Sequence, residues 1–199
     1  MIRCMRALAP VIAAFVALLS GCAHQPTLPT GPIPADLSQL ERWQAHGRIA
    51  VSGPENGGSG SFNWQQQRDR SDIAIHGPIG IGSVNLKLHG NANDPKVELR
   101  TTKGEVFEGD MAWRELEARL GAPVPAGYLR YWMLGLPAPG EYQWLSQDPQ
   151  GSATLEQSGW QIEYQQYSDD PGARVPKRIR AANGLARVRI VIDSWQLGR

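Results

Sequence analysis

Two serines in a glycine-rich segment come nearest to a nucleophile motif in this chain. The run Gly58-Ser59-Gly60-Ser61 contains part of a Gly-x-Ser-x-Gly elbow, but Ser61 stands where the last glycine is required. The elbow also needs a strand–turn–helix context, and the surrounding sequence does not offer one. We therefore assign the glycines of this run to a turn, predict no catalytic residue and expect that the protein is not an enzyme.

The glycines and histidines supply no cofactor or metal motif. Gly80-Ile81-Gly82 is followed by Asn85, where a dinucleotide fingerprint needs a third glycine. The histidines lack metal-ligand spacing, and a loop over residues 77–82 would set His76 opposite Ser83 rather than opposite another histidine. We expect neither a cofactor nor a metal site.

The cysteine at position 22 has the clearest chemical signature. Residues 1–6 carry two arginines, residues 7–19 are almost wholly apolar, and Leu19-Ser20-Gly21 precedes Cys22. This pattern describes an export signal, and its apolar run is too short to span a bilayer comfortably. Leu19–Cys22 also resembles the bacterial lipobox. That resemblance implies cleavage after residue 21, a diacylglyceryl thioether on Cys22 and an acyl chain on its new amino group. The alternative is an ordinary cleaved signal.

Composition excludes several classes of function. Removal of residues 1–21 leaves 178 of the 199 residues, enough for one domain with a substantial core. Arg3 and Arg6 leave with the signal, so 18 Lys and Arg face 19 Asp and Glu, which argues against nucleic-acid binding. Cys4 also leaves and lipid would cap Cys22, so we expect no disulfide and no catalytic thiol.

A proline-rich segment separates the cysteine from the rest of the chain. Residues 23–35 contain four prolines, and such sequence favours extended, poorly packed backbone. We interpret residues 22–35 as the lipidated cysteine with a tether that reaches about 40 Å when fully extended. Asp directly after the lipidated cysteine is associated with retention in the inner membrane. Since Ala23 stands there, resemblance to lipoproteins of two-membrane bacteria implies the outer membrane.

Residues 36–199 are predicted to form a single domain that is mostly β. Apolar residues alternate with polar or small ones in many short runs, and glycine-rich turns separate several of them. Asn183-Gly184 indicates a tight type I′ hairpin between the last two runs. About eleven such strands favour an antiparallel sheet curled into a barrel or half-barrel. The runs are marked by Ile49 and Val51, Phe62 and Trp64, Ile73 and Ile75, Val84 to Leu88, Val97 and Leu99, Tyr142 and Trp144, Ala153 and Leu155, Trp160 to Tyr164, and Val188 to Ile192.

Two short helices are predicted from capping signals and apolar spacing. Asp36 and Gln39 have the spacing of a capping box, and Leu37, Leu40 and Trp43 share a helical face. Asp110 is placed to cap a second helix, in which Trp113, Leu116 and Leu120 form the apolar face and which Gly121 ends.

A third segment, Tyr128–Pro137, is apolar nearly all round if it is helical, with Arg130 its one charge. A helix without a polar face is buried or covers something apolar. Two interpretations remain open: a core helix that plugs the barrel, or a lid over a hydrophobic cavity.

Two surface features also allow two interpretations each. Ile79 and Ile81 occupy a glycine-rich turn, where their side chains either fold back onto the core or protrude as an apolar probe. The C-terminal hairpin is rich in basic residues, which form either a solvated strand face or a docking surface for an acidic partner or anionic lipid. These residues are Arg174, Lys177, Arg178, Arg180, Arg187 and Arg189.

Taken together, these features resemble the LolB family of outer-membrane lipoprotein receptors. The resemblance implies an unclosed antiparallel β-barrel whose helices form a lid over a hydrophobic cavity. It also implies acceptance of triacylated lipoproteins from a soluble, LolA-like periplasmic carrier and their insertion into the inner leaflet of the outer membrane. It rests on Leu19–Cys22, Trp43 with Gly47-Arg48-Ile49-Ala50-Val51, Gly60-Ser61-Phe62-Asn63-Trp64, Gly77-Pro78-Ile79-Gly80 and Leu129–Pro137.

The resemblance also assigns individual residues. Ile79, after Pro78, matches the family's exposed leucine in a loop associated with delivery into the membrane, and Ile81 adds a second apolar tip. Arg48 lies in the family's Gly-Arg strand without an assigned role. We expect acyl chains to contact a set of apolar residues: Trp64, Ile73, Ile75, Leu86, Leu88, Trp132, Met133, Leu136, Trp144 and Ile162.

Two other functions compete with this one. A structural or assembly-platform lipoprotein would have a barrel filled by its own side chains and hence no ligand cavity. A periplasmic hydrolase or transferase would need a nucleophile or a carboxylate pair in a cleft, and the sequence offers no convincing set.

Overall fold

The computed structural model describes most of the chain after the proposed tether: residues 36–54, 57–77, 82–120, 123, 125–148, 151–168 and 173–198. No helix in these ranges combines the length and the apolar character needed to cross a membrane.

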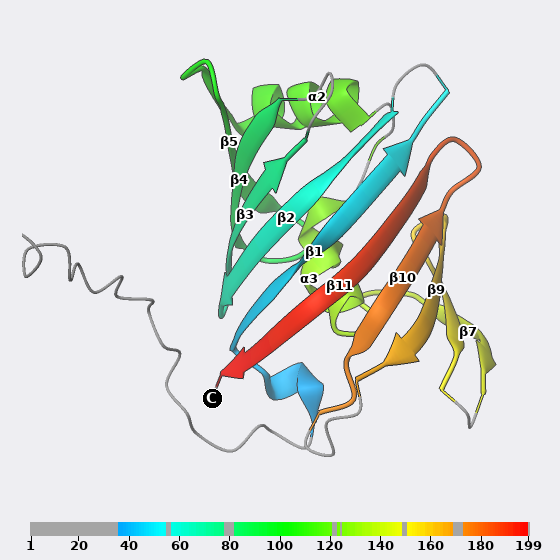
Figure 1. Ribbon diagram of the computed structural model, residues 1–199. Helices are drawn as coiled ribbons and strands as arrows, with labels where there is room; N and C mark the ends of the chain where they lie inside the picture. Colours follow the sequence, from blue (N-terminus) through cyan, green and yellow to red (C-terminus); the bar gives the residue numbers. More distant parts are fainter. Residues whose placement is uncertain are drawn as a thin grey trace, which may run out of the picture.

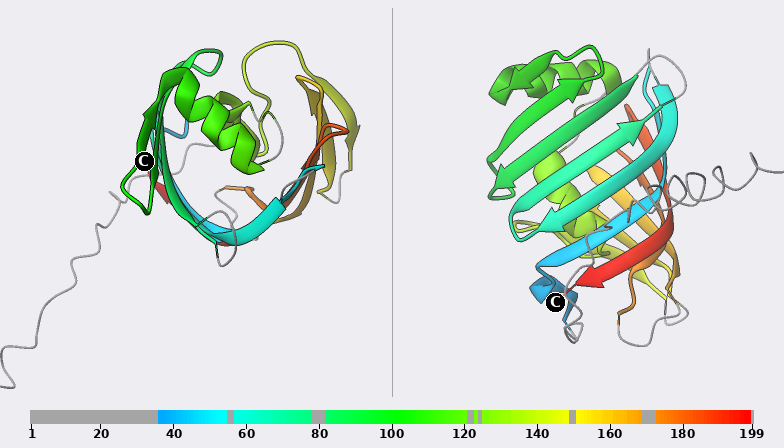
Figure 2. Two further views of the ribbon diagram at one scale, coloured as in Figure 1. Left: turned by 90° about the horizontal axis from the view of Figure 1, so that it is seen from above. Right: turned by 60° about the vertical axis from the view of Figure 1, so that its left-hand side comes forward.

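One antiparallel sheet dominates the described residues, with its eleven strands in the order β6-β5-β4-β3-β2-β1-β11-β10-β9-β8-β7. The first and last strands pair at its centre, and the sheet curves round without its edges β6 and β7 meeting (Figures 1 and 2). The predicted unclosed antiparallel half-barrel is therefore confirmed. The strands are β1 (Arg42–Ser52), β2 (Gly57–Gln67), β3 (Arg70–His76), β4 (Ser83–Gly90), β5 (Pro95–Thr101), β6 (Val106–Glu108), β7 (Gln143–Gln147), β8 (Ala153–Gln157), β9 (Trp160–Tyr167), β10 (Pro176–Ala182) and β11 (Arg187–Gly198).

Alternating side chains give the sheet one buried face. In β4, Val84, Leu86 and Leu88 are buried whereas Lys87 between them is exposed. Successive side chains of a strand point to opposite faces, so this period of two places the apolar set on the concave side. The concave side of the sheet is therefore lined by apolar side chains along strands such as β4.

The centre of the sheet depends on a glycine at a close approach. A Cβ atom on Gly47 would collide with the backbone oxygen of Val191 and lie 2.9 Å from the Phe62 ring. The register between β1 and β11 shifts at His46/Gly47, as at a β-bulge. Bulges bend strands and increase their twist, which here helps the long central pair to curve.

Two helices lie inside the curve of the sheet (Figure 2). Helix α2 (Gly109–Leu120) packs against β5 and β6, and helix α3 (Ala126–Met133) follows it. Asp110 lies in the first turn of α2 rather than at its cap, because the helix already begins at Gly109. At the start of α3, any side chain on Gly127 would collide with the backbone oxygen of Ala92, which fixes the helix close to the β4–β5 connection.

The predicted opening helix is wrong in extent. Only a 3-10 turn, η2 (Leu37–Gln39), forms, and Asp36 accepts a 2.9 Å hydrogen bond from the Ser38 backbone. Trp43 belongs to β1 instead, where it is almost fully buried. Its helical spacing from Leu40 competes with its strand spacing to Ala45, and pairing with β2 and β11 decides for the strand.

The predicted two-residue type I′ turn at Asn183-Gly184 is also wrong. Ala182 pairs with Arg187, so four residues connect β10 to β11. A type I′ turn needs positive φ at both central residues, and of these two only Gly184 has it. Asn183 instead uses Oδ1 to accept hydrogen bonds from the backbone of Leu185 and Ala186, at 3.1 and 2.8 Å.

Candidate functional site

An apolar cavity of about 90 Å³ lies between the concave face of the sheet and the two helices. All of its lining residues are hydrophobic and none is charged, and the indole N–H groups of Trp64 and Trp132 are already bonded to Gln66 and Gln157. The lining residues are Ile49, Val51, Phe62, Trp64, Ile73, Ile75, Leu86, Leu116, Leu129, Trp132, Met133, Trp160, Ile162, Ile179, Ala181, Val188 and Ile190.

Strands and helices contribute to this lining by their separate periodicities. Ile73 and Ile75, two residues apart on β3, point to the same side of the sheet. Leu129, Trp132 and Met133 lie at i, i+3 and i+4 on α3 and so share one helical face. The alternation of the strands and the 3.6-residue period of the helix thus converge on one apolar space.

The charge of Arg130 on α3 is satisfied away from the cavity. Its guanidinium donates hydrogen bonds to the Gly90 carbonyl, at 3.5 Å, and to the Tyr131 hydroxyl, at 2.9 Å. It also lies 4.8 Å from the centre of the Tyr131 ring. The arginine therefore helps to hold α3 against the β4 end without bringing charge to the lining.

A buried glutamine fixes the other side of α3. Gln157, at the end of β8, is only 2% exposed. Its Oε1 accepts hydrogen bonds from the Trp132 indole and from the Ala138 backbone, both at 2.9 Å. Its Nε2 donates to the Ala138 carbonyl at 2.8 Å. One side chain thus joins α3 and the segment after it to the sheet.

Aromatic rings and a second buried glutamine close the cavity beside β1. The ring centre of Trp43 lies 5.3 Å from that of Trp64, a lining residue. The Trp64 indole donates to Gln66, which also accepts a 2.6 Å hydrogen bond from Ser71.

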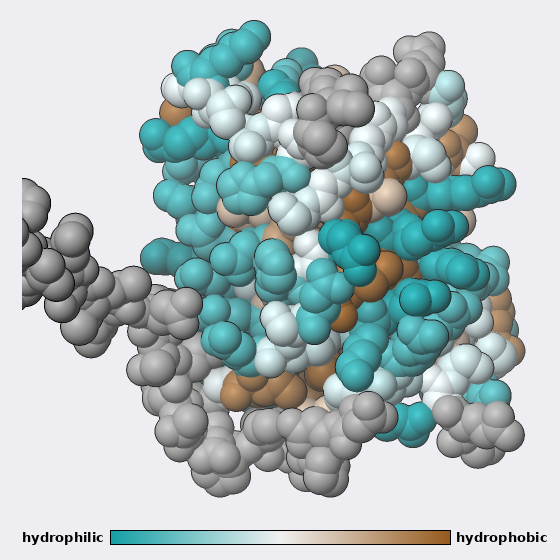
Figure 3. All heavy atoms as spheres, viewed as in Figure 1, coloured by the Kyte–Doolittle hydropathy of each residue, from teal (hydrophilic) through white to brown (hydrophobic). Residues whose placement is uncertain are grey.

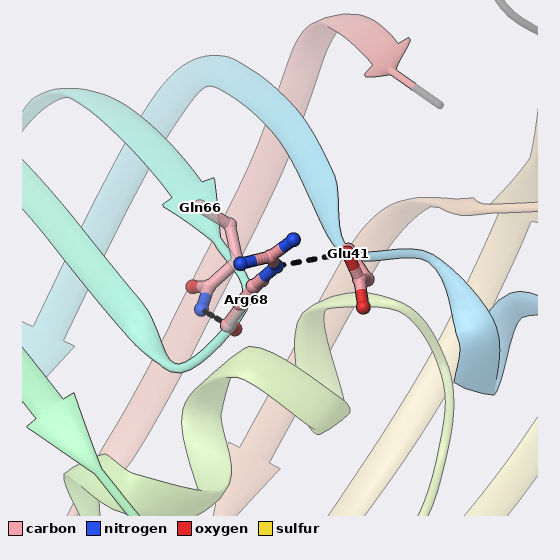
Figure 4. A network of polar contacts seen from close by, with 3 residues as sticks. All are labelled: Glu41, Gln66 and Arg68. Carbon is pink, nitrogen blue, oxygen red and sulfur yellow. Dashed lines mark hydrogen bonds and ion pairs between the residues drawn. The ribbon is translucent and has the colours of Figure 1, made fainter.

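Gln66 extends this network to the surface (Figure 4). It donates to the backbone carbonyl of Arg68, whose side chain forms a 3.1 Å ion pair with Glu41. The polar groups of Trp64, Gln66 and Ser71 thus find their hydrogen-bond partners at the edge of the cavity rather than inside it.

Electrostatics give the cavity no acid–base or metal chemistry. Within the described ranges, no three His, Cys, Asp or Glu residues are grouped to hold a metal ion. Burial raises the pKa of Tyr164, whose hydroxyl has no hydrogen-bond partner among the described residues, but this residue lies outside the lining. The arrangement suits the binding of apolar groups.

The structure brings most of the predicted apolar set together. Seven of the ten residues line the cavity: Trp64, Ile73, Ile75, Leu86, Trp132, Met133 and Ile162. The other three lie outside it. Leu88 is in the same buried row of β4, two residues beyond Leu86, and Leu136 lines a separate groove with Leu37 and Tyr131. Trp144 packs against Tyr164, with 6.2 Å between the ring centres. Contact of the seven with acyl chains stays a prediction.

Several lining residues were not among the predicted set. Phe62, Trp160 and Ile190 belong to alternating runs that the sequence shows, and Leu116 lies on the predicted apolar face of α2. Their periodicity identifies them as inward-facing. Nothing in a single sequence ranks inward-facing residues by their distance from the two helices.

Other predicted sites fall outside the cavity or outside the described residues. Cys22 and the loop residues Pro78, Ile79 and Ile81 lie outside the described residues. Ser59 and Ser61 lie within β2, so they belong to a strand and not to the turn expected from their glycines. His76 pairs with Ser83 as expected, with 3.2 Å between Nδ1 and Oγ.

Comparisons with known proteins found a matching family model, curated relatives and similar solved structures. The family model "Outer membrane lipoprotein LolB" matches residues 41–195. A curated relative from Marinomonas sp., named outer-membrane lipoprotein LolB, is 32% identical over 94% of this chain and 96% of its own length. Another of the same name, from Stutzerimonas stutzeri, is 35% identical over 96% of this chain and 97% of its own length. A solved LolA superfamily protein from Nitrosomonas europaea is 10% identical with a TM-score of 0.46, covering 81% of this chain and 88% of its own. The matched residues include β1 to β10, both helices and β11 as far as Trp195.

Proposed function

This chain belongs to the LolB family of outer-membrane lipoproteins, and we propose that its apolar cavity receives the acyl chains of triacylated lipoproteins. The protein is a lipid-anchored outer-membrane receptor of lipoprotein localisation that faces the periplasm. A soluble LolA-like carrier delivers the cargo, and the receptor inserts it into the inner leaflet of the outer membrane. The observation that carries the proposal is the wholly hydrophobic lining under two helices.

The chemistry of the cargo explains why such a lining is needed. Each buried methylene contributes about 0.8 kcal/mol, so three long acyl chains together hold a lipoprotein in a membrane by well over 20 kcal/mol. Release into water is correspondingly slow. A protein that replaces water by hydrophobic side chains removes most of this cost. Transfer from carrier to receptor then needs only a small difference in affinity, since about 1.4 kcal/mol changes an equilibrium tenfold.

The size of the cavity implies that the helices move when cargo binds. A cavity of about 150 Å³ accommodates a benzene-sized molecule. The space here, about 90 Å³, is smaller than that, and one acyl chain has many more carbons than benzene. Leu116 of α2 and Trp132 and Met133 of α3 must therefore withdraw from the sheet to admit it. We propose that α2 and α3 form the lid that opens.

Lipid on Cys22 and the loop with Ile79 complete the proposal. The acyl groups on Cys22 keep the receptor at the membrane in which cargo is deposited. The apolar tips Ile79 and Ile81, next to Pro78, enter the bilayer during delivery. No bond in the cargo is made or broken, so the proposed role needs no catalytic residue, metal or other cofactor.

Transfer of acylated cargo tests the proposal. The mature chain with Cys22→Ala, which lacks the lipid but keeps every described residue, is mixed with a carrier loaded with acylated lipoprotein. Cargo is expected to appear on the receptor, and fatty acids are expected to displace a fluorescent acyl probe from it. A folded protein that takes neither cargo nor probe would instead be the structural lipoprotein with a filled barrel, an alternative that the small volume of the cavity favours.

Delivery is tested separately from acceptance. Ile79→Glu is expected to leave acceptance from the carrier intact while blocking insertion of cargo into liposomes. If this variant fails to fold, the isoleucine belongs to the core and the loop has no delivery role.

A further inference from the structure

Three arginines form a row on the outer face of the β10–β11 hairpin. Arg180 pairs with Arg189, and Arg187 pairs with Ala182 one step nearer the tip, so their side chains share one face. All three are exposed, and Figure 3 shows hydrophilic residues gathered over these two strands. We call Arg180, Arg187 and Arg189 the arginine row.

Neighbouring acids offset the charge of the arginine row only in part, because Glu163 of β9 lies opposite Arg180 whereas Ala50 and Ser52 of β1 lie opposite Arg189 and Arg187. Among the described residues, none of its members forms an ion pair, whereas nearby Arg48 pairs with Asp193 at 3.1 Å. The row lines a surface groove of about 500 Å³ with the small residues Ala50 and Ser52 of β1, and Glu163 is the groove's one acidic residue. Arg187 and Arg189 therefore border open space that the short side chains opposite them leave accessible, while Arg180 lies beside Glu163.

The tip of the same hairpin presents an exposed leucine. Leu185 is 61% exposed although it is fully apolar. The turn that carries it is well ordered by hydrogen bonds, because Asn183 accepts from the backbone of both Leu185 and Ala186. Figure 1 shows the hairpin at the end of the sheet where β1 and β3 also end. Leucine and arginines thus lie at one end of the molecule.

We propose that this hairpin binds the surface of an anionic phospholipid bilayer, with Leu185 in the acyl boundary and the arginine row on lipid phosphates. The inference rests on the proposed function in one respect, namely that the protein works at a membrane. Leu185 precedes Arg187 by two residues in the connection, so Arg187 lies at most roughly 7 Å behind it. Arg189 lies roughly 7 Å farther back, because a strand advances about 3.3 Å per residue. Headgroup layers are about 5–8 Å thick, so Arg187 reaches the phosphates when Leu185 passes them.

This layering favours a bilayer over an acidic protein as the occupant. An acidic protein surface would match the arginines but would give no reason for an isolated leucine to project beyond them. A bilayer matches both features, because its apolar chains would receive the leucine and the negatively charged headgroup layer above them would face the arginines. Arg180 and Arg189, farther back, remain near the screening length of about 8–10 Å from the surface and still attract it.

Vesicle binding tests the proposal with a matched pair of variants. The mature chain with Cys22→Ala is sedimented with vesicles of phosphatidylcholine alone and of phosphatidylcholine with phosphatidylglycerol. Each arginine near an anionic surface contributes about fivefold in affinity, so Arg187→Gln with Arg189→Gln should weaken binding to the anionic vesicles on the order of 25-fold. Arg70→Gln with Lys96→Gln removes the same charge at the opposite end of the sheet and should change binding little.

The leucine has its own test. Leu185→Asn should weaken binding to both vesicle types several-fold, because the apolar contribution does not depend on lipid charge. The arginine variants should lose only the preference for phosphatidylglycerol. This separation of the two effects is the signature of a hairpin that inserts its tip and holds phosphates behind it.

Other outcomes overturn the proposal. If the Arg187 and Arg189 variant binds anionic vesicles as tightly as the parent, the hairpin is not a membrane contact. If vesicle binding is unchanged but transfer from the loaded carrier slows in the absence of lipid, the row docks an acidic protein instead. Acceptance of cargo by the parent chain is measured in parallel, so a failure of the receptor function is distinguished from a failure of this inference.

Discussion

The Trp132 indole donates a 2.9 Å hydrogen bond to Gln157, which joins the proposed lid helix α3 to strand β8. Gln157 also satisfies both backbone groups of Ala138, so replacing it leaves several buried polar groups without partners. Each such group costs about 1–3 kcal/mol. We therefore expect Gln157→Leu to lower the free energy of unfolding by several kcal/mol, measured by urea denaturation. The exposed Gln161→Leu on β9 is the control and should change it little.

Filling the cavity should block acyl binding without unfolding the protein. Ala181 lines the cavity, and its neighbour Ala182 lies on the outer face of the same strand. A phenyl ring at Ala181 occupies the space that an acyl chain needs, at a cost of about 1–3 kcal/mol in stability. We expect Ala181→Phe to weaken binding of a fluorescent acyl probe at least tenfold by titration. Equal weakening by Ala182→Phe would contradict the assignment of the cavity.

The Tyr164 hydroxyl should make the protein sensitive to alkali. Burial raises the pKa of Tyr164 above its ordinary value of 10.0, so the folded state keeps a proton that the unfolded state loses above pH 10. The contribution of this hydroxyl to the free energy of unfolding is fully present below pH 10 and decreases as the pH rises above 10. Tyr164→Phe should remove part of this fall and, since the hydroxyl has no partner among the described residues, leave stability at pH 8 equal or higher.

Urea denaturation at pH 8 and at pH 11 measures this effect. Tyr142→Phe is the control, because it removes the same hydroxyl from a tyrosine that is half exposed. An identical loss of stability between the two pH values in the parent and in Tyr164→Phe would show that other groups govern the alkaline response.

Arg48 should contribute little to stability despite its ion pair. Its guanidinium lies 3.1 Å from Asp193, but both side chains are largely open to solvent, which screens the attraction. We expect Arg48→Ala, Asp193→Ala and the double variant to give a coupling energy below about 1 kcal/mol by thermal or urea denaturation. A larger loss of cargo transfer than of stability in Arg48→Ala would assign this arginine a functional role.

Local periodicity was sufficient to predict the sheet and much of the cavity. Ile73 and Ile75, for example, face inward because they are two residues apart, and the same rule predicts Trp64 and Ile162. Where two local signals compete, the sequence alone does not decide. Trp43 fits both a helix with Leu40 and a strand with Ala45, and only pairing with distant β11 resolves the choice.

The extent of the cavity needs the tertiary structure. Leu88 has the same inward orientation as Leu86, yet it lies past the region that the helices enclose. Trp144 alternates as predicted but its strand is at the sheet edge, where it packs on Tyr164. The role of Gln157 was not predictable either, because its hydrogen bonds to Trp132 and Ala138 depend on where α3 and the segment after it return to the sheet.

The length of the tether should decide whether the anchored receptor can place its hairpin on the membrane. The described chain begins at the end of the sheet opposite to the hairpin. Strand β1 has 11 residues, so it is about 36 Å long at roughly 3.3 Å per residue, and its tilt in a curved sheet makes the height between the ends smaller, about 28 Å. Residues 23–35 reach about 40 Å when extended, which exceeds this height.

Deletion of residues 27–32 leaves seven tether residues, with a reach of about 22 Å, which is less than the height of the sheet. The lipidated deletion protein should therefore accept cargo from the carrier normally but insert it slowly into liposomes that contain phosphatidylglycerol. Replacing the same six residues by glycine and serine keeps the length and should preserve insertion. Equal insertion rates for the deletion and replacement proteins would mean that the hairpin end need not reach the membrane that holds the anchor, because reach is the property that separates the two proteins.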